Sequence, residues 1–405
     1  MTDVLIAGGG IAGSVLAVIL GRRGLSVELF ERSHFPREKP CGEGLMPAGV
    51  AVLQRLGLAE AVGGTPFYGV RYHFGGQTAE VHFPKTAGLP QAGRAQRRKH
   101  LDAVLFDAAT TTPGVRAHTG AIVEAPLLEN ERVIGLRVNG EEKRAALVVA
   151  ADGVHSRIRH FLGLDKPHRR KRLAVRAHFQ LLPGHRQPPS VDVFVCPGYE
   201  LYVTPLPQGE VLIAGLAYAE AVHGSIEAEF HRWCNSQPSL AARLKGAKQV
   251  TKLTATSPLS GTARTGVAPG VVLLGDAAGF LDPITGGGMS QALMTAELLA
   301  HYVYEQLGTD ERWLQDFERE RQLLLRDYTI LTRMVLWLAD HPRLAERMLS
   351  ALQLSPGLFS HLVGVSGGVR RLWDWRQDVE ARNQRMIQFS RSSTFVASSA
   401  AARRV

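Results

Sequence analysis

The chain has 405 residues, of which 45% are hydrophobic and 21% charged, so it has the composition of a folded globular protein rather than of a disordered, collagen-like or disulfide-rich one. Lys and Arg number 47 against 37 Asp and Glu, and the net charge of +10 raises the question of an anionic partner. The favoured interpretation of the basic run 157–186 is a solvated face, with attraction of an anionic cofactor, substrate or lipid as the alternative, and its scarcity of aromatic residues argues against nucleic acid. The three cysteines are scattered without a C-x-x-C pair, so we expect a reducing, cytoplasmic location and no metal site.

The N-terminal residues predict a β-α-β unit. A buried strand is expected at residues 4–7, an apolar helix at 11–23 and a second strand at 27–30. Right-handed crossover of such units builds a parallel sheet with helices on its faces.

A glycine motif lies between the first strand and the helix. Gly8, Gly10 and Gly13 have the spacing G-x-G-x-x-G, and Glu31 ends the second strand. Such glycines allow a tight turn and a close approach of pyrophosphate to the helix N-terminus, and an acid at this place accepts hydrogen bonds from ribose. The pattern predicts a bound dinucleotide, with NAD and FAD both compatible.

Three groups of antiparallel strands are expected next. Alternating residues at 70–74 and 81–83 flank Gly75-Gly76, and the segments 133–138 and 145–150 flank Asn139-Gly140, a strong signal for a two-residue hairpin turn. A third group comprises residues 191–196, 200–204 and 211–218. From residue 289 to about 390 the apolar spacing is helical, and no run of 18 apolar residues predicts a membrane span.

Two further motifs follow predicted strands. ALVVAADGVHSRIRHFLGL contains Asp152-Gly153, and GVVLLGDAAGFLDPITGGGMSQAL contains Gly275-Asp276 followed by a glycine loop that opens a helix. With the N-terminal motif, their order and spacing over residues 1–305 resemble the superfamily of FAD-dependent aromatic hydroxylases, geranylgeranyl reductases and flavin halogenases, of the group A monooxygenase type. The resemblance implies FAD as the cofactor and NAD(P)H as a transient reductant.

The resemblance also assigns site residues. Asp276 would bind the ribityl chain, the loop 283–288 would lie by the isoalloxazine ring, and Arg98, with Arg97 as the alternative, would reach the flavin side chain or the pyrophosphate. The segment FPREKPCGEGLMP resembles the stretch that passes in front of the flavin, where Glu43 is a further candidate. The candidate cofactor-binding residues are Gly8, Gly10, Ile11, Ala12, Gly13, Glu31, Arg32, Arg37, Cys41, Gly42, Arg98, Asp152, Gly153, Gly275, Asp276, Pro283, Gly286, Gly287, Gly288 and Met289.

The expected fold is α/β, with a Rossmann-like FAD-binding domain interleaved with an antiparallel β-sheet substrate domain, plus C-terminal helices. We assign residues 1–65, 96–165 and 262–310 to the FAD-binding domain and residues 66–95 and 166–261 to the substrate domain. Residues 311–390 form the helical region, and residues 391–405 a loose tail. The helical region either packs as a cap over the core or makes a peripheral contact with a membrane.

The favoured function is an FAD-dependent monooxygenase that uses NAD(P)H and O2 to hydroxylate or epoxidise a lipophilic aromatic or polyketide-like molecule of secondary metabolism through a flavin C4a-hydroperoxide. The alternative is a reductase that saturates prenyl or other isolated double bonds. Halogenation is disfavoured, because Glu200 and Tyr202 stand where flavin halogenases carry two tryptophans. No catalytic residue beyond the flavin is identified, and the oligomeric state stays open. Candidate substrate contacts are Phe74, Phe83, Phe194 and Tyr202.

Overall fold

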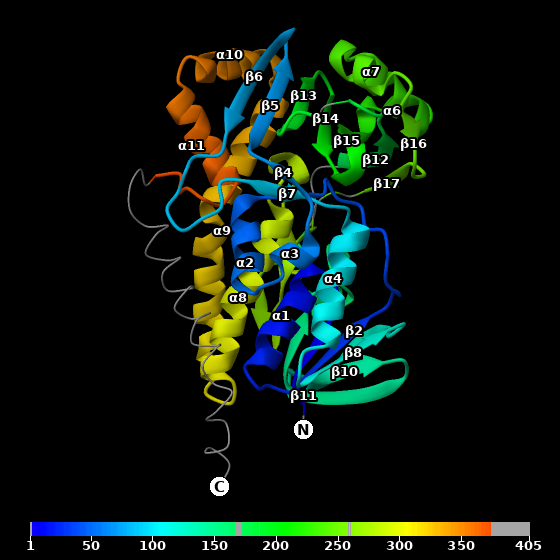
Figure 1. The fold of residues 1–405 in the computed structure, drawn as a ribbon. Helices are drawn as coiled ribbons and strands as arrows, with labels where there is room; N and C mark the ends of the chain where they lie inside the picture. The colour runs from blue at the N-terminus through cyan, green and yellow to red at the C-terminus, as the bar shows by residue number, and fades with distance from the viewer. Residues whose placement is uncertain (1, 167–171, 186, 258, 260, 374–405) are drawn as a thin grey trace.

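The computed structural model describes residues 2–166, 172–185, 187–257, 259 and 261–373. The described part contains two large sheets, one above the other in Figure 1, with long helices along one side of both. The expected α/β fold is confirmed.

The first sheet is built around parallel strands in the order β19-β20-β11-β1-β2-β8. The strands β1, β2, β8, β11 and β20 are parallel, and β19 is antiparallel to β20. Their bounds are β1 Thr2–Ala7, β2 Val27–Glu31, β8 Val115–Thr119, β11 Glu141–Ala150, β19 Val267–Ala268 and β20 Val271–Leu273.

The three predicted motifs meet because these strands are parallel. Ala7 is paired with Phe30 and Ala150, and Ala150 with Leu273, so four strands end at one edge of the sheet. Parallel α/β sheets bind their ligands at this carboxyl edge. The motifs beginning at Gly8 and Asp152 therefore lie side by side although the sequence separates them widely.

Both faces of the first sheet are covered. The helices α1 (Ile11–Arg22), α4 (Arg98–Thr110) and α8 (Gly288–Gln306) bury apolar side chains such as Val15 and Leu299 against one face. The antiparallel strands β9 (Val123–Glu129) and β10 (Arg132–Val138) and the short helix α5 (Arg157–Phe161) cover the other. The predicted hairpin at Asn139-Gly140 is present, with both residues at positive φ.

The second sheet has the order β16-β12-β15-β14-β13-β5-β6, and β17 also pairs with β12. It is antiparallel except for the pair β13–β5, which is parallel because β5 joins from a distant hairpin rather than through a tight turn. Its strands are β5 Gly69–Phe74, β6 Gln77–His82, β12 Arg172–Gln180, β13 Val191–Cys196, β14 Tyr199–Pro205, β15 Glu210–Tyr218, β16 Lys248–Gln249 and β17 Thr254–Thr256. The helices α6 (Ile226–Asn235) and α7 (Pro238–Leu244) pack near its outer face, around Phe230, Trp233 and Leu240.

Short elements connect the two sheets. They are β3 Gly44–Leu45, α2 Pro47–Arg55, α3 Ala59–Val62, β4 Thr65–Phe67, β7 Gly93–Ala95, β18 Gly261–Thr262 and β21 Gly279–Phe280. The strands β3, β7 and β4 form a small sheet of their own, and β18 pairs with β21. The chain crosses between the large sheets several times, and the assignment of residue ranges to domains stays a prediction.

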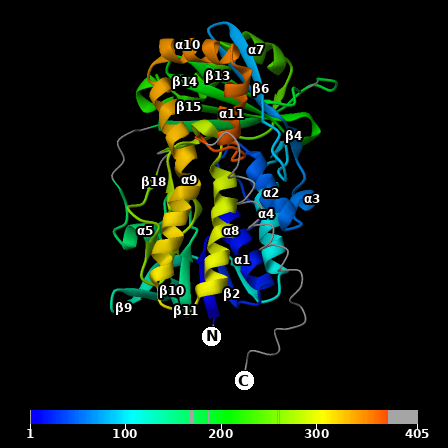
Figure 2. The same cartoon turned by 90° about the vertical axis from the view of Figure 1, so that its left-hand side faces the viewer.

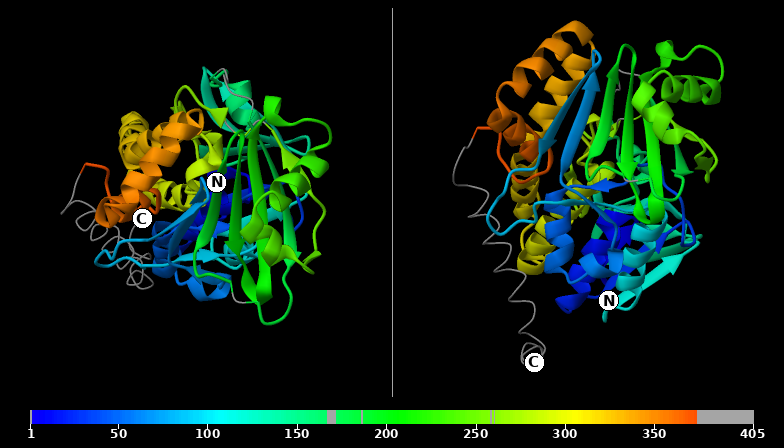
Figure 3. Two further views of the ribbon diagram at one scale, coloured as in Figure 1. Left: turned by 90° about the horizontal axis from the view of Figure 1, so that it is seen from above. Right: turned by 45° about the horizontal axis from the view of Figure 1, so that its top comes forward.

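The C-terminal helices run back over both sheets. Helix α9 (Arg312–Ala339) lies beside α8, and α10 (Pro342–Gln353) and α11 (Pro356–Ser366) reach the β5–β6 hairpin (Figures 2 and 3). Of the described helices, none alone is long and apolar enough to cross a membrane, although α10 and α11 together, bent by 115°, meet that length and composition. Residues 374–390 of the predicted helical region and the predicted tail at 391–405 lie outside the described residues.

Candidate functional site

A cavity of about 640 Å³ runs from the carboxyl edge of the first sheet to the space between the second sheet and α9–α11. At one end its wall includes Gly10, Glu31 and Asp276, and at the other it includes Val193, Leu338 and Phe359. We call these the motif end and the apolar end.

Two helix N-termini open onto the motif end. The N-cap residues of α1 and α8 are Gly10 and Gly287, and neither supplies a side-chain cap. Uncapped amides at a helix N-terminus carry partial positive charge and bind anions. A Cβ atom added to Gly10 would have Arg37 Nη2, 3.7 Å away, as its nearest neighbour, so the cavity beside the α1 N-terminus is open to a ligand.

Glu31 has a structural role in the glycine turn. Its Oε2 accepts a hydrogen bond of 3.0 Å from the Gly9 amide, and its Oε1 accepts one of 2.9 Å from the Ser33 amide. Arg37 Nη2 lies 3.5 Å from the same carboxylate. The side chain therefore fixes the glycine turn while it lines the cavity.

The other two motifs add acidic groups to this end. Asp152 Oδ2 accepts from the Arg157 amide at 2.9 Å, while its buried Oδ1 has no hydrogen-bond partner among the described residues. Burial raises the pKa of Asp152. Asp276 Oδ2 lies 4.0 Å from Lys39 Nζ, and both side chains are about one third exposed, so this pair contributes little to stability.

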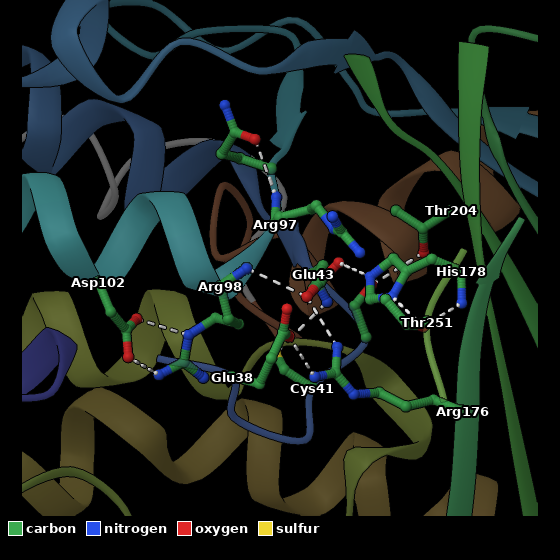
Figure 4. A network of polar contacts seen from close by, with 12 residues as sticks. Glu38, Cys41, Glu43, Arg97, Arg98, Asp102, Arg176, His178, Thr204 and Thr251 are labelled. Carbon is green, nitrogen blue, oxygen red and sulfur yellow. Dashed lines mark hydrogen bonds and ion pairs between the residues drawn. The ribbon is translucent and has the colours of Figure 1, made fainter. Parts of the chain in front are cut away.

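Arg98 forms part of the wall in a fixed orientation. Its Nε and Nη2 donate to the two oxygens of Asp102 at 2.7 and 2.8 Å, and the residue is 4% exposed (Figure 4). Arg97, the alternative candidate, does not line the cavity. The bidentate pair holds the guanidinium beside the motif end without occupying the cavity itself.

A buried ionic cluster anchors the segment that precedes β3. Glu43, at φ 58° and 1% exposed, binds Arg176 Nη1 at 2.7 Å and His178 Nε2 at 2.8 Å (Figure 4). Arg176 also reaches Glu38 Oε2 at 3.0 Å. Burial acts to raise the pKa of Glu43, but the contacts with His178 and Arg176 lower it overall. Two strand residues of the second sheet thus hold the segment of Cys41 and Gly42 against the cavity.

At the apolar end, strand β14 supplies polar groups. Glu200, 8% exposed, forms a close ion pair with Arg172, whose Nη1 donates to Asp282 Oδ1 at 2.8 Å. Asp282 in turn caps the turn Pro283–Thr285 by accepting from the Ile284 amide at 2.9 Å, and Tyr202 donates to the Ile284 carbonyl at 3.0 Å. Burial raises the pKa of Glu200 to about 7, although Arg172 acts to lower it. This network ties the second sheet to the glycine loop.

Most predicted cofactor residues come together in one wall. The exceptions are Gly13 and Gly287, which do not line the cavity. A Cβ atom on Gly13 would lie 2.0 Å from the Gly8 carbonyl, so Gly13 serves the close contact of helix and strand. The Gly287 amide donates to Tyr328 on α9 at 3.0 Å.

Of the four candidate substrate contacts, Tyr202 alone lines the cavity. Phe74 and Phe83 are buried in the core near the β5–β6 hairpin. Phe194 points to the outer face of the second sheet, because strand alternation brings its neighbours Val193 and Val195 to the cavity instead.

Sequence reasoning missed Arg172, Arg176, Glu200 and the cavity-facing side of α9–α11. The interpretation of the basic run as a solvated face is wrong for Arg159, Arg172 and Arg176, which are buried and paired. A signal was present: Arg172, Arg176 and His178 share one parity in a β-strand, as inward-facing residues do. Arg169, Arg170, Lys171 and Arg186 lie outside the described residues.

The residues present fit FAD. The two uncapped helix N-termini suit a pyrophosphate and the electron-rich edge of a flavin, and the open space over Gly10 admits a phosphate close to the backbone. The unpartnered Asp152 Oδ1 adds an acceptor for a ligand donor.

Comparisons with known proteins agree. The family described as "FAD binding domain" matches residues 1–329. Menaquinone reductase of Mycobacterium tuberculosis is 30% identical over 322 residues, covering 74% of this chain and 75% of that protein. Squalene monooxygenase of Mus musculus is 31% identical over 321 residues, covering 73% of this chain but only 54% of its own length.

Solved structures share the fold. A flavin-dependent brominase superposes with a TM-score of 0.79 at 19% identity, covering 96% of this chain and 99% of its own. A geranylgeranyl bacteriochlorophyll reductase-like protein of Thermoplasma acidophilum gives 0.69 at 20% identity, with coverages of 95% and 98%. The cofactor is FAD, and the chain belongs to the FAD binding domain family of flavin-dependent oxidoreductases.

Proposed function

We propose that the protein is a monooxygenase that uses NAD(P)H and O2 to hydroxylate or epoxidise a lipophilic aromatic or polyketide-like molecule. The observation that carries the proposal is the continuity of the cavity, in which the motif end and the apolar end share one space. Bound FAD supplies electron transfer from NAD(P)H to O2, and the protein supplies binding, orientation and exclusion of water.

The apolar end meets the requirement for a dry chamber. One side is the inner face of the second sheet, with Val191, Val193 and Val195 of β13. The other side is formed by α9, α10 and α11, with residues such as Leu338, Leu349, and Val363. An apolar wall of this kind accepts a lipophilic molecule and restricts water near the reacting atoms.

The names of the relatives also support a lipophilic substrate. Squalene and menaquinone, which appear in the names of two of them, are both lipophilic. A third, digeranylgeranylglycerophospholipid reductase 2 of Methanopyrus kandleri, is 25% identical over 356 residues and covers 82% of this chain and 87% of its own. These names support a lipophilic substrate and leave oxygenation and reduction as the two reactions to distinguish.

The second candidate is reduction of a carbon–carbon double bond. It is favoured by Glu200, because a carboxyl with a pKa of about 7 is partly protonated at neutral pH and lines the cavity near the glycine loop. Saturation of a double bond needs a proton as well as a hydride. Glu200 is placed to supply that proton in such a reaction.

Turnover with and without O2 separates the two reactions. The purified holoenzyme is incubated with NADPH or NADH and a panel of lipophilic phenols and polyprenyl compounds, aerobically and in an anaerobic chamber. The proposal predicts an oxygenated product in air and no product without O2. A saturated product that forms equally well under both conditions would overturn it in favour of the reductase.

We also propose that the exposed apolar surface of α9–α11 contacts an anionic membrane. Exposed basic side chains, among them Arg333 and Arg347, lie on α9 and α10, and Met334, which is 43% exposed, also lines the cavity. A lipophilic substrate would therefore pass from the bilayer to the cavity near Met334. The exposed apolar side chains of this surface include Met334, Trp337, Leu344, Leu354 and Leu358.

Vesicle co-sedimentation tests this contact. Wild-type protein should sediment with vesicles of phosphatidylglycerol and phosphatidylcholine, and Trp337→Glu and Leu354→Glu should reduce the bound fraction several-fold because each places a charge in the interface. Leu128→Glu, at a residue of β9 that is 48% exposed, is the matched control and should bind normally. Equal sedimentation of all four proteins, or none with the wild type, would contradict the contact.

A further inference from the structure

Polar side chains interrupt the apolar end at one place on the second sheet. In the register of the sheet Tyr72 lies opposite Val193, and Val193 lies opposite Tyr202, so the two tyrosines flank one valine. Glu200 lies two residues from Tyr202 on the same face of β14. All four residues line the cavity.

Strand geometry sets the scale of this group. Neighbouring strands are about 4.8 Å apart and residues two apart on a strand about 6.6 Å, so the Cα atom of Tyr72 is about 10 Å from that of Tyr202 and about 12 Å from that of Glu200. These distances suit a single aromatic ring held between polar side chains. One small residue leaves room beside the group, since Ala214 lies opposite Tyr202 on β15.

Tyr202 and Tyr72 differ in how their hydroxyl groups are used. Tyr202 donates to the Ile284 carbonyl of the glycine loop. Tyr72 stacks on Phe359 of α11 with ring centroids 5.6 Å apart, and its hydroxyl has no hydrogen-bond partner among the described residues. Burial raises the pKa of Tyr72 to about 12, so the hydroxyl keeps its proton and stays a donor. Tyr72 is half-buried and lines the cavity, so this hydroxyl is free to donate to a ligand oxygen there.

We propose that Tyr72 and Glu200 hold the ring of a phenolic lipid, with Tyr72 donating to one ring oxygen, Glu200 accepting from a ring hydroxyl, and the alkyl chain lying between β13 and α9–α11. This inference rests on the proposed function and names its substrate class. The phenol is oriented by Glu200, which the Arg172–Asp282 contacts couple to the glycine loop. The ring is thereby placed at the boundary between the apolar end and the motif end of the cavity.

Two probes that differ only in their hydroxyl groups test the proposal. Hexylresorcinol and hexylbenzene are titrated into the holoenzyme, and binding is followed through the change in the flavin absorption spectrum. Tyr72→Phe should weaken the binding of hexylresorcinol by about threefold to tenfold, the usual effect of losing one neutral hydrogen bond, and leave hexylbenzene unchanged. Glu200→Gln should likewise weaken hexylresorcinol alone.

Tyr199→Phe is the matched control. Tyr199 belongs to β14 as well, but it stacks on Trp233 at the outer face and bonds Ser236, so its loss should not affect either probe. Equal losses for both probes in Tyr72→Phe, or unchanged binding of hexylresorcinol, would overturn the inference. If the inference is overturned, oxygen-dependent turnover of another lipophilic substrate would still leave the proposed monooxygenase intact. If oxygen-dependent turnover is absent as well, the proposed monooxygenase is also refuted.

Discussion

Two glycines of the same motif should respond to alanine in opposite ways. At Gly10 the backbone is extended, with φ −77° and ψ −169°, and an added Cβ would meet nothing closer than Arg37 Nη2 at 3.7 Å. At Gly13 the added Cβ would lie 2.0 Å from the Gly8 carbonyl oxygen, well inside van der Waals contact. Gly10→Ala should therefore fold normally and obstruct FAD, whereas Gly13→Ala should damage the fold.

The expected magnitudes follow from these contacts. Replacing glycine where alanine fits stabilises a protein by about 0.4–1 kcal/mol, so apo Gly10→Ala should unfold at or slightly above the wild-type temperature. Overpacking costs about 1–3 kcal/mol, so Gly13→Ala should unfold at a lower temperature. Thermal unfolding of the apoproteins measures both effects. Titration of apo Gly10→Ala with FAD should show at least tenfold weaker binding, a loss of about 1.4 kcal/mol. Wild-type affinity in Gly10→Ala would refute the placement of FAD over α1.

Three further predictions concern charged groups. Glu31→Ala should lower FAD affinity, and it should lower apoprotein stability by about 1–3 kcal/mol because the buried Gly9 amide loses its acceptor. A loss of FAD affinity with unchanged stability would contradict the role of Glu31 in holding the glycine turn. Asp276→Ala should reduce FAD occupancy while the apoprotein melts normally, since Lys39 is 4.0 Å away, and unchanged occupancy would exclude Asp276 from the cofactor site. Infrared spectroscopy should detect a carboxyl that loses its proton near pH 7, and this signal should be missing in Glu200→Gln. Arg172→Met should shift the midpoint of this titration upward, because it removes the cation that favours the carboxylate. A downward shift would refute the pairing of Arg172 with Glu200.

The fold could be predicted in outline because its signals are local. Glycine at a strand-to-helix turn, Asn139-Gly140 between alternating segments and apolar spacing in α8 each specify an element through its own residues. The parallel pairing of β13 with β5 could not be predicted in this way, because it joins residues more than a hundred positions apart without a turn between them.

The motif end of the site could be predicted for the same reason, whereas the apolar end could not. Gly8, Asp152 and Asp276 follow parallel strands and must meet at one edge. The predicted substrate contacts are aromatic residues on strands, but strand parity and tertiary packing decide which strand residues face the cavity: Phe194 faces outward, and Val193 faces inward. The contribution of α9–α11 depends on the path of the chain back over the second sheet.

The most direct test of the proposed monooxygenase is isotope labelling of the product. Holoenzyme, NADPH and hexylresorcinol are incubated under 18O2, and the product is analysed by mass spectrometry. Incorporation of one atom of 18O from O2 into the ring is the result that the proposal predicts. Conversion of hexylresorcinol to a product that carries no 18O from O2 would contradict it.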